Sequence, residues 1–332
     1  MNRDSGDRKI LYELDKNARQ SLKQIGRTVR LSPEVVFHRI RNLEKEGIIE
    51  YYYTTIDPSK FGYKAFRVYV KAQDLTLEKE KEIFDWLVQN KKTWWVLRVE
   101  GKWDIDFFLW VKDDYEFEQE WLKFSQRFRK YIDEKLIQIY THLHHFHRPY
   151  LIGKKNDEEK EEVIFSNQRE QVDTIDLQIL SLLSTNARMK ITEMSKKIPL
   201  TPKNIAQRIK GLQKKNIILS FRVKINLEKI GYRYYKIEVD LNNYARLRQL
   251  YQFAKLHPNI TYINQVIGLA DFDADIEVPS EEEFDKVITQ IKKEFGEDIR
   301  DIRYLTIRKV YKISYIPEFE FHIPVGLIKS SS

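Results

Sequence analysis

The chain has 332 residues, long enough for two or more domains, and 42% of them are hydrophobic. It contains no cysteine, which excludes a disulfide framework and a thiolate metal site. No apolar run approaches the roughly 20 residues that a membrane helix needs, and the first residues have no signal-peptide core. Together with a net charge of +8, this predicts a soluble, cytoplasmic protein without a membrane partner.

Three short helices are predicted at the start of the chain. Residues 7–14 and 22–29 have helical period, and a third helix is expected over residues 33–45. Ser32 is a good N-cap for the third helix, and Pro33 suits its first position. Two helices joined by a tight turn behind another helix form a helix-turn-helix, whose second helix enters the major groove of DNA.

The helix over residues 33–45 is predicted to be amphipathic. Val36, Ile40 and Leu43 share one face. The opposite face carries hydrogen-bonding and mostly basic residues, which are Glu34, His38, Arg41, Asn42 and Lys45. Residues 48–56 then favour a strand, and a strand pair after a recognition helix is the wing of a winged helix. A generic three-helix module that binds nothing is the alternative for this stretch alone.

Residues 64–150 have a different character. Their alternating and helical patterns predict the order βαββαβ, which is a ferredoxin-like sheet with two helices on one face. A tight turn is expected at residues 101–104. The expected strands are 65–71, 94–99, 105–111 and 136–146, and the expected helices are 77–88 and 115–131.

The pattern returns after a shift of 169 residues, which marks a duplicated module. Arg39, Ile40 and Leu43 become Arg208, Ile209 and Leu212. The predicted division of the chain is a winged helix-turn-helix at 1–63, a βαββαβ domain at 64–150, an acidic solvated linker at 151–172, a second winged helix-turn-helix at 173–232, a second βαββαβ domain at 233–317 and a tail at 318–332. The predicted fold class is therefore α+β.

Positive charge is concentrated on the helix-turn-helix copies. Residues 173–232 hold 12 Lys and Arg against 4 Asp and Glu, and residues 1–63 hold 12 against 9. Phosphate contacts require such a distribution. An ordinary lysine-rich solvated surface is the alternative.

On these motifs, each half resembles one subunit of the Lrp/AsnC (feast/famine) transcription regulators. The matching motifs are Asp7-Arg-Lys-Ile-Leu, Leu31-Ser-Pro, Arg39-Ile with Leu43 and Gly47-Ile-Ile, and a Gly-x-x-Asp turn in each half. The resemblance implies a DNA-binding regulator of transcription. Family members usually carry one copy per chain and pair as dimers, so this tandem chain is expected to pair its two halves internally, to form a homo-oligomer, or both.

Carried over position by position, the resemblance implies that both recognition helices contact double-stranded DNA, with Arg39 and Arg208 near the phosphates. Arg and Asn can read base edges, whereas Lys mostly meets phosphate, so the two copies should prefer different half-sites. The predicted contacts are Ser32, Glu34, His38, Arg39, Arg41, Asn42 and Lys45 in the first copy and Thr201, Lys203, Asn204, Gln207, Arg208, Lys210 and Lys214 in the second.

No cofactor is predicted, but the resemblance implies an effector, often an amino acid, near the Gly-x-x-Asp turns. The effector-binding candidates are Gly101, Asp104, Gly268 and Asp271. The alternative is that Gly and Asp only form a hairpin turn, since both residue types favour turns.

Three other functions are alternatives to regulation of transcription. Siroheme decarboxylases resemble this arrangement and carry a His-Asn-Tyr-Arg stretch on the second strand of the βαββαβ domain, but residues 94–98 and 262–265 contain no histidine here. No nucleophile–base pair or phosphate loop stands out, so we expect no enzymatic activity. A DNA-compacting role without sequence specificity is the second alternative. The third is a metal site, for which His142 and His144 are candidates because they share a strand face. They are weak candidates because no carboxylate is interleaved with them. A polar or pH-sensitive strand edge is the simpler interpretation.

Overall fold

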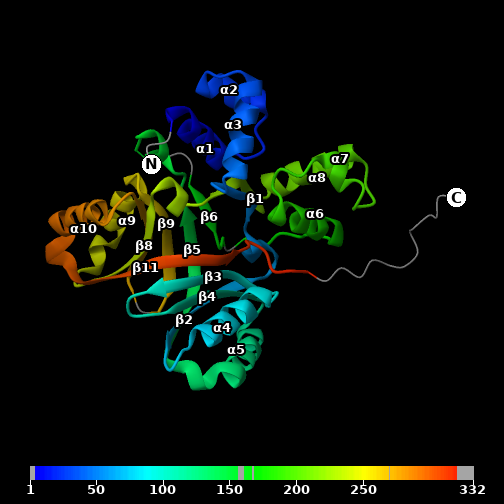
Figure 1. The fold of residues 1–332 in the computed structure, drawn as a ribbon. Helices are drawn as coiled ribbons and strands as arrows, with labels where there is room; N and C mark the ends of the chain where they lie inside the picture. Colours follow the sequence, from blue (N-terminus) through cyan, green and yellow to red (C-terminus); the bar gives the residue numbers. More distant parts are fainter. Residues whose placement is uncertain (1–3, 156–160, 167, 269, 320–332) are drawn as a thin grey trace.

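The computed structural model describes residues 4–155, 161–166, 168–268 and 270–319. Two small helical heads lie beside each other above two sheet domains, and each sheet domain carries its own helix pair (Figure 1). Figure 1 also shows that the helices of the two sheet domains lie on separate sides of the molecule, with the strands between them. Among the described residues, no helix is long and apolar enough to span a membrane.

The two heads have the same order of elements. The first head contains α1 (Ser5–Lys16), α2 (Leu22–Val29), α3 (Pro33–Lys45) and β1 (Ile49–Ile56). The second head contains α6 (Thr174–Thr185), α7 (Ile191–Met194), α8 (Pro202–Lys214) and β7 (Ile218–Ile225). The strand pair expected after each recognition helix is formed by the heads together, because β1 pairs antiparallel with β7 in a two-stranded sheet.

Each sheet domain has the predicted βαββαβ order, which confirms the ferredoxin-like fold. The first consists of β2 (Lys64–Ala72), α4 (Leu77–Gln89), β3 (Thr93–Glu100), β4 (Ile105–Val111), α5 (Asp114–Phe128) and β5 (Ile132–His145). The second consists of β8 (Arg233–Leu241), α9 (Leu247–Leu256), β9 (Ile260–Ile267), β10 (Phe272–Val278), α10 (Glu281–Phe295) and β11 (Ile299–Ile313).

The two sheets merge into a closed ring. Neighbouring strands follow the order β2-β4-β3-β11-β8-β10-β9-β5, and β5 also pairs with β2. The long strands β5 and β11 make this possible, because each pairs with its own domain along its first part and with the other domain along its second part. The predicted pairing of the two halves within one chain is therefore present in the structure.

The predicted acidic linker is not wholly irregular. Its residues Glu162–Ile164 form β6, which adds to the edge of β5. Glu162 is buried, which corrects the interpretation of this charge run as a solvated segment. Glu161 of that charge run is also described and pairs with Lys255 at 2.7 Å. Residues 157–160 of the run, and the end of the tail at residues 320–332, lie outside the described residues.

Equivalent positions of the two halves can be matched along the strands. They differ by 169 residues up to β2 and β8 and by 167 from the ends of α4 and α9 onward, because the second copy is two residues shorter in between. Asp104 and Asp271 are equivalent in this frame, and each accepts a hydrogen bond from a backbone amide, of Ala72 at 2.8 Å and of Leu241 at 2.7 Å.

Charged side chains cross-link the two halves inside the ring. Arg67 is fully buried and forms a bidentate pair with Asp106, at 2.9 and 2.6 Å, and a third bond to Asp273 at 2.9 Å. Its equivalent, Lys236, contacts Asp273 and lies 2.6 Å from Asp275. Buried charges persist only when they are paired and hydrogen-bonded, so these contacts hold the two sheet domains together in one arrangement.

Candidate nucleic-acid interface

The recognition helices α3 and α8 are built alike. Ser32 and Thr201 are the N-caps, and each side chain accepts a backbone N–H bond at 3.3 Å. A proline follows each cap, where no amide donor is lost. The inward stripes are buried and pack each helix on its head, as predicted; they are Val36, Ile40 and Leu43 in α3 and Ile205, Ile209 and Leu212 in α8.

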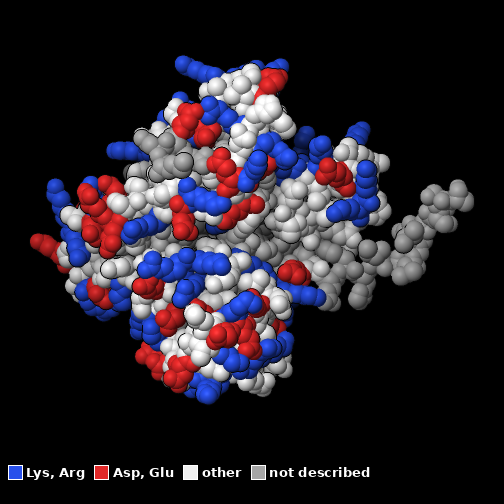
Figure 2. Space-filling view, viewed as in Figure 1, with Lys and Arg blue, Asp and Glu red and all other residues white. Residues whose placement is uncertain are grey.

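The outward faces of both helices are open to solvent. Most predicted DNA contacts lie there and are exposed, namely Glu34, His38, Arg41, Asn42 and Lys45 in α3 and Lys203, Asn204, Gln207, Lys210 and Lys214 in α8. Figure 2 shows Lys and Arg side chains projecting from the outer ends of both heads, with a few acidic side chains between them. This surface suits a polyanion with a groove that accepts a helix.

The two arginines predicted to lie near phosphates form ion pairs within the protein. Arg39 pairs with Asp7 at 2.8 Å, and Arg208 pairs with Asp176 at 3.0 Å. The partners are equivalent residues in the first helix of each head. Both arginines therefore hold the recognition helix against that first helix. Their place near the phosphates of DNA stays a prediction.

The two heads are locked to each other by a reciprocal arginine contact. Arg19 donates to Ala187 O at 2.6 Å, and its equivalent Arg188 donates to Ala18 O at 2.6 Å. Burial lowers the pKa of Arg19, and the charge of Arg188 lowers it further. Sequence reasoning missed this pair, although the identical Asn-Ala-Arg triplets of both copies were the signal that could have revealed it.

Backbone bonds strengthen the same junction. Seven residue pairs align β1 with β7 in the antiparallel sheet, from Ile49 with Ile225 to Ile56 with Ile218. Thr54 also donates to Leu183 O at 2.7 Å, from one head into the other. The spacing between α3 and α8 is therefore fixed by the fold, because β1 and β7 join the two heads directly.

The first head rests on the ring through a buried ionic junction. Arg222 donates to Asp15 at 2.8 Å, Arg148 donates to Asp15 at 2.8 Å, and Arg148 also donates to Glu277 at 2.8 Å. Glu162 lies 3.4 Å from Arg222. Although burial alone raises the pKa of a carboxyl group, Arg222 and Arg148 hold the pKa of Asp15 well below its usual value.

Beneath the second head the equivalent positions are mostly aromatic instead, and they share one apolar core with Leu183 of α6. The positions equivalent to Asp15, Arg148, Arg222 and Glu277 are Ser184, Tyr315, Tyr53 and Trp110. Tyr53 and Tyr315 stack with ring centroids 5.6 Å apart and planes 8° apart. The duplicated heads thus share their fold but differ in the chemistry that attaches them.

The Gly-x-x-Asp turns are packed tightly against the long strands. A side chain at Gly101, where φ is +138°, would meet Leu305 at 2.9 Å, and one at Gly268 would meet Gln138 at 2.6 Å. Asp104 and Asp271 accept the backbone amides described above. These contacts account for both glycines and both aspartates without a ligand.

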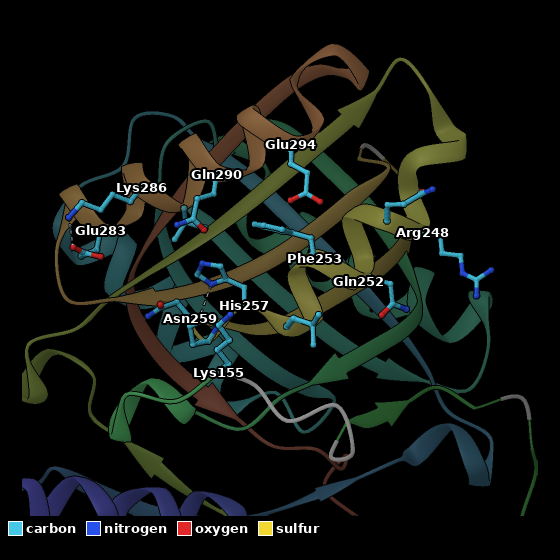
Figure 3. Close-up of a pocket in the computed structure, with 14 residues that line it drawn as sticks. Lys155, Arg248, Gln252, Phe253, His257, Asn259, Glu283, Lys286, Gln290 and Glu294 are labelled. Atoms are coloured by element: carbon cyan, nitrogen blue, oxygen red, sulfur yellow. Dashed lines mark hydrogen bonds and ion pairs between the residues drawn. The ribbon is translucent and has the colours of Figure 1, made fainter.

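A groove of about 1120 Å³ lies between α9 and α10. Figure 3 shows the side chains of both helices around it, with Phe253 in the middle and His257 and Asn259 at one side. In the first domain the equivalent positions hold Trp86, which packs on Phe124, and Arg127, which pairs with Glu82 at 3.0 Å. In the second domain the smaller Phe253 replaces Trp86, and Glu294 and Gln249 replace the ion pair, which leaves room for the groove.

The histidine-rich strand forms imidazole–carboxylate contacts rather than a metal cluster. His144 contacts Glu161, and His145 Nδ1 lies 3.2 Å from Glu162. Within the described ranges, no group of three or more His, Cys, Asp or Glu side chains is placed to hold a metal ion. His142, the other weak metal candidate, lies beside His144, with ring centroids 6.1 Å apart.

The two heads and their exposed recognition helices define a helix-turn-helix protein. A winged helix-turn-helix DNA-binding model matches residues 3–50, and an AsnC-type helix-turn-helix domain model matches residues 172–213. An HTH-type transcriptional regulator of Pyrococcus horikoshii is 30% identical over 106 residues, which cover 32% of this chain and 70% of that protein. The chain belongs to the Lrp/AsnC family.

Longer matches agree with a duplicated unit. An HTH-type transcriptional regulator of Pyrococcus furiosus is 26% identical over 45% of this chain and 97% of its own length. The regulator LrpB of Bacillus subtilis is 28% identical over 43% of this chain and 93% of its own length. Each relative thus corresponds to about half of this chain.

Solved structures of an enzyme, NirDL, match nearly the whole chain. The siroheme decarboxylase NirDL, in complex with an iron-uroporphyrin III analogue, superposes with a TM-score of 0.62 over 96% of this chain and 95% of that chain. The two sequences are 12% identical, so this likeness shows a shared fold and says nothing about activity.

Proposed function

We propose that this chain is a sequence-specific DNA-binding regulator of transcription that acts without catalysis and contacts two half-sites of one duplex. The observation that supports it most directly is the rigid pair of heads, each with an exposed recognition helix. In the family two chains usually supply two heads, whereas here one chain supplies both. Because α3 and α8 present different side chains, the two half-sites are expected to differ in sequence.

Selection from randomised duplexes tests this function. At about 150 mM salt, where counterion release weakens non-specific contacts, we expect enrichment of two dissimilar half-sites at one fixed spacing. A fixed spacing follows from the β1–β7 pairing and the Arg19–Arg188 contacts. Enrichment of half-sites at variable spacing would contradict the rigid pair.

The same selection separates the alternatives. Tight binding without an enriched motif would favour an architectural, DNA-compacting protein. Absence of DNA binding would favour the decarboxylase alternative if, in addition, the visible absorption bands of siroheme differ between siroheme mixed with the chain and free siroheme. The relatives named above are regulators, and β3 and β9 carry Trp94 and Thr261 at equivalent positions without a histidine in residues 93–100 or 260–267.

For an effector, we propose the groove between α9 and α10 rather than the packed turns. Phe253 and Val287 give it apolar surface, and Arg248 and Lys155 on its rim could pair with a carboxylate. An amino acid that binds there at 100 times its Kd would stabilise the chain by about 2.7 kcal/mol. We expect thermal melting of the chain with single amino acids to find such a ligand. Phe253→Trp, which places in the groove the larger residue found at this position in the first domain, should abolish the rise in melting temperature.

The exposed Tyr115→Ala variant on α5 serves as the control and should keep the ligand-induced rise in melting temperature. A rise that persists in Phe253→Trp would place the effector elsewhere.

A further inference from the structure

The first recognition helix carries an unusual exposed aromatic side chain. Phe37 is 47% exposed and is one of few large apolar side chains that face solvent in the described part of the chain. Its ring contacts His38 edge-on, with centroids 5.5 Å apart. Single exposed apolar side chains are common on protein surfaces, so it is the place of Phe37 on the recognition helix that makes it a candidate for a contact with a partner.

The position of Phe37 limits what that partner can be. Phe37 lies one turn before Arg41, on the same edge of α3, because residues four apart on a helix are neighbours. His38 and Lys45 lie on the outward face beside this edge and are exposed. An apolar ring surrounded by cationic and hydrogen-bonding groups suits a surface that is anionic at its rim and apolar at one point inside.

The major groove of DNA has this chemistry. Phosphates line its edges, and the thymine 5-methyl group is the apolar group on its floor, where phenylalanine can contact it. We propose that Phe37 reads thymine methyl groups in the half-site bound by the first head. This inference rests on the proposed DNA-binding function and names a specificity-determining residue for it.

The second head provides an internal control. The residue equivalent to Phe37 is Ala206, and the residue equivalent to Arg41 is Lys210. Since Ala206 ends at its Cβ atom, it cannot reach as far into the groove as a phenyl ring. The thymine preference is therefore a property of the first head alone.

Replacing thymine by deoxyuridine, which lacks only the 5-methyl group, tests the proposal on the full chain. The probe is the duplex selected by the wild-type chain, and the half-site of the first head is the one whose enrichment is lost in Arg41→Ala. Uracil at a contacted position should weaken wild-type binding about fourfold per methyl group. Phe37→Ala should bind the thymine duplex as weakly as wild type binds the uracil duplex, and should not distinguish the two.

Two further variants sharpen the test. Ala206→Phe should create a similar thymine preference in the other half-site, and Tyr115→Ala should leave both preferences unchanged. Equal wild-type binding of thymine and uracil duplexes, a first half-site without thymine, or persistent discrimination in Phe37→Ala would each overturn the proposal. If the wild-type chain shows no sequence-specific DNA binding at all, the result is different, because it overturns the proposed function and this inference together.

Discussion

Arg222→Met is expected to lower the free energy of unfolding by about 3–5 kcal/mol, because it removes one partner from a buried ion cluster. Arg222 is fully buried and bonds Asp15 at 2.8 Å and the backbone oxygen of Phe146 at 2.8 Å. Without the guanidinium group of Arg222, the negative charges of Asp15 and Glu162 stay buried with fewer positive charges to offset the cost of desolvation. Urea denaturation at pH 7 measures the loss.

The equivalent position in the other copy of the duplicated unit supplies a matched control for this prediction. Tyr53 is the residue equivalent to Arg222, and Tyr53→Phe keeps the ring that stacks on Tyr315. Its cost should stay below about 1.5 kcal/mol, as for other volume-conserving changes. Combining Arg222→Met with Glu162→Gln should cost less than the sum of the single changes, since the second removes a carboxylate that the first leaves unpaired. A loss below about 1.5 kcal/mol in Arg222→Met would show that the cluster contributes little to stability.

Stability is expected to fall as the pH drops below about 6.5, the usual pKa of an unfolded histidine. Burial and the nearby Arg222 lower the pKa of His145 to about 3. Between these two values the unfolded chain binds a proton at this position and the folded chain does not. The free energy of unfolding therefore falls by about 1.4 kcal/mol for each pH unit that the pH drops, from His145 alone.

Carboxyl groups extend the acid sensitivity to lower pH. Burial alone would raise the pKa of Glu162, but Arg222 and His145 lower it to about 2. Its contribution to stability is complete above the pKa of an unfolded glutamate and is lost as the pH falls toward 2. The two groups thus act over successive pH ranges.

His145→Gln separates these contributions. Urea denaturation at several pH values gives the number of protons taken up on unfolding, and between pH 6.5 and 4.5 this number should be about one lower in His145→Gln than in wild type. An unchanged slope in His145→Gln would mean that His145 is already protonated in the folded chain. The slope is informative even if the variant is less stable overall.

Much of the fold could be predicted from local patterns. The apolar stripe of Val36, Ile40 and Leu43 and the cap at Ser32 depend on residues within a few positions of each other, so they identify the recognition helix without tertiary information. The same holds for the βαββαβ order, because alternation and helical period are local signals. The match between Arg39 and Arg208 revealed the duplication and, with it, the family.

What the sequence determined by itself is therefore the identity of the modules, their order and the outward faces of α3 and α8. Only the tertiary structure decided how the modules join: the shared β1–β7 sheet, the closed ring through β5 and β11, and the ionic junction of Asp15, Arg148, Arg222 and Glu277. The junction residues are more than 50 positions apart along the chain, and no periodic pattern links them. Strand partners and ion pairs depend on which surfaces meet after folding, and for that reason the pairing of Arg39 with Asp7 could be known only from the tertiary structure.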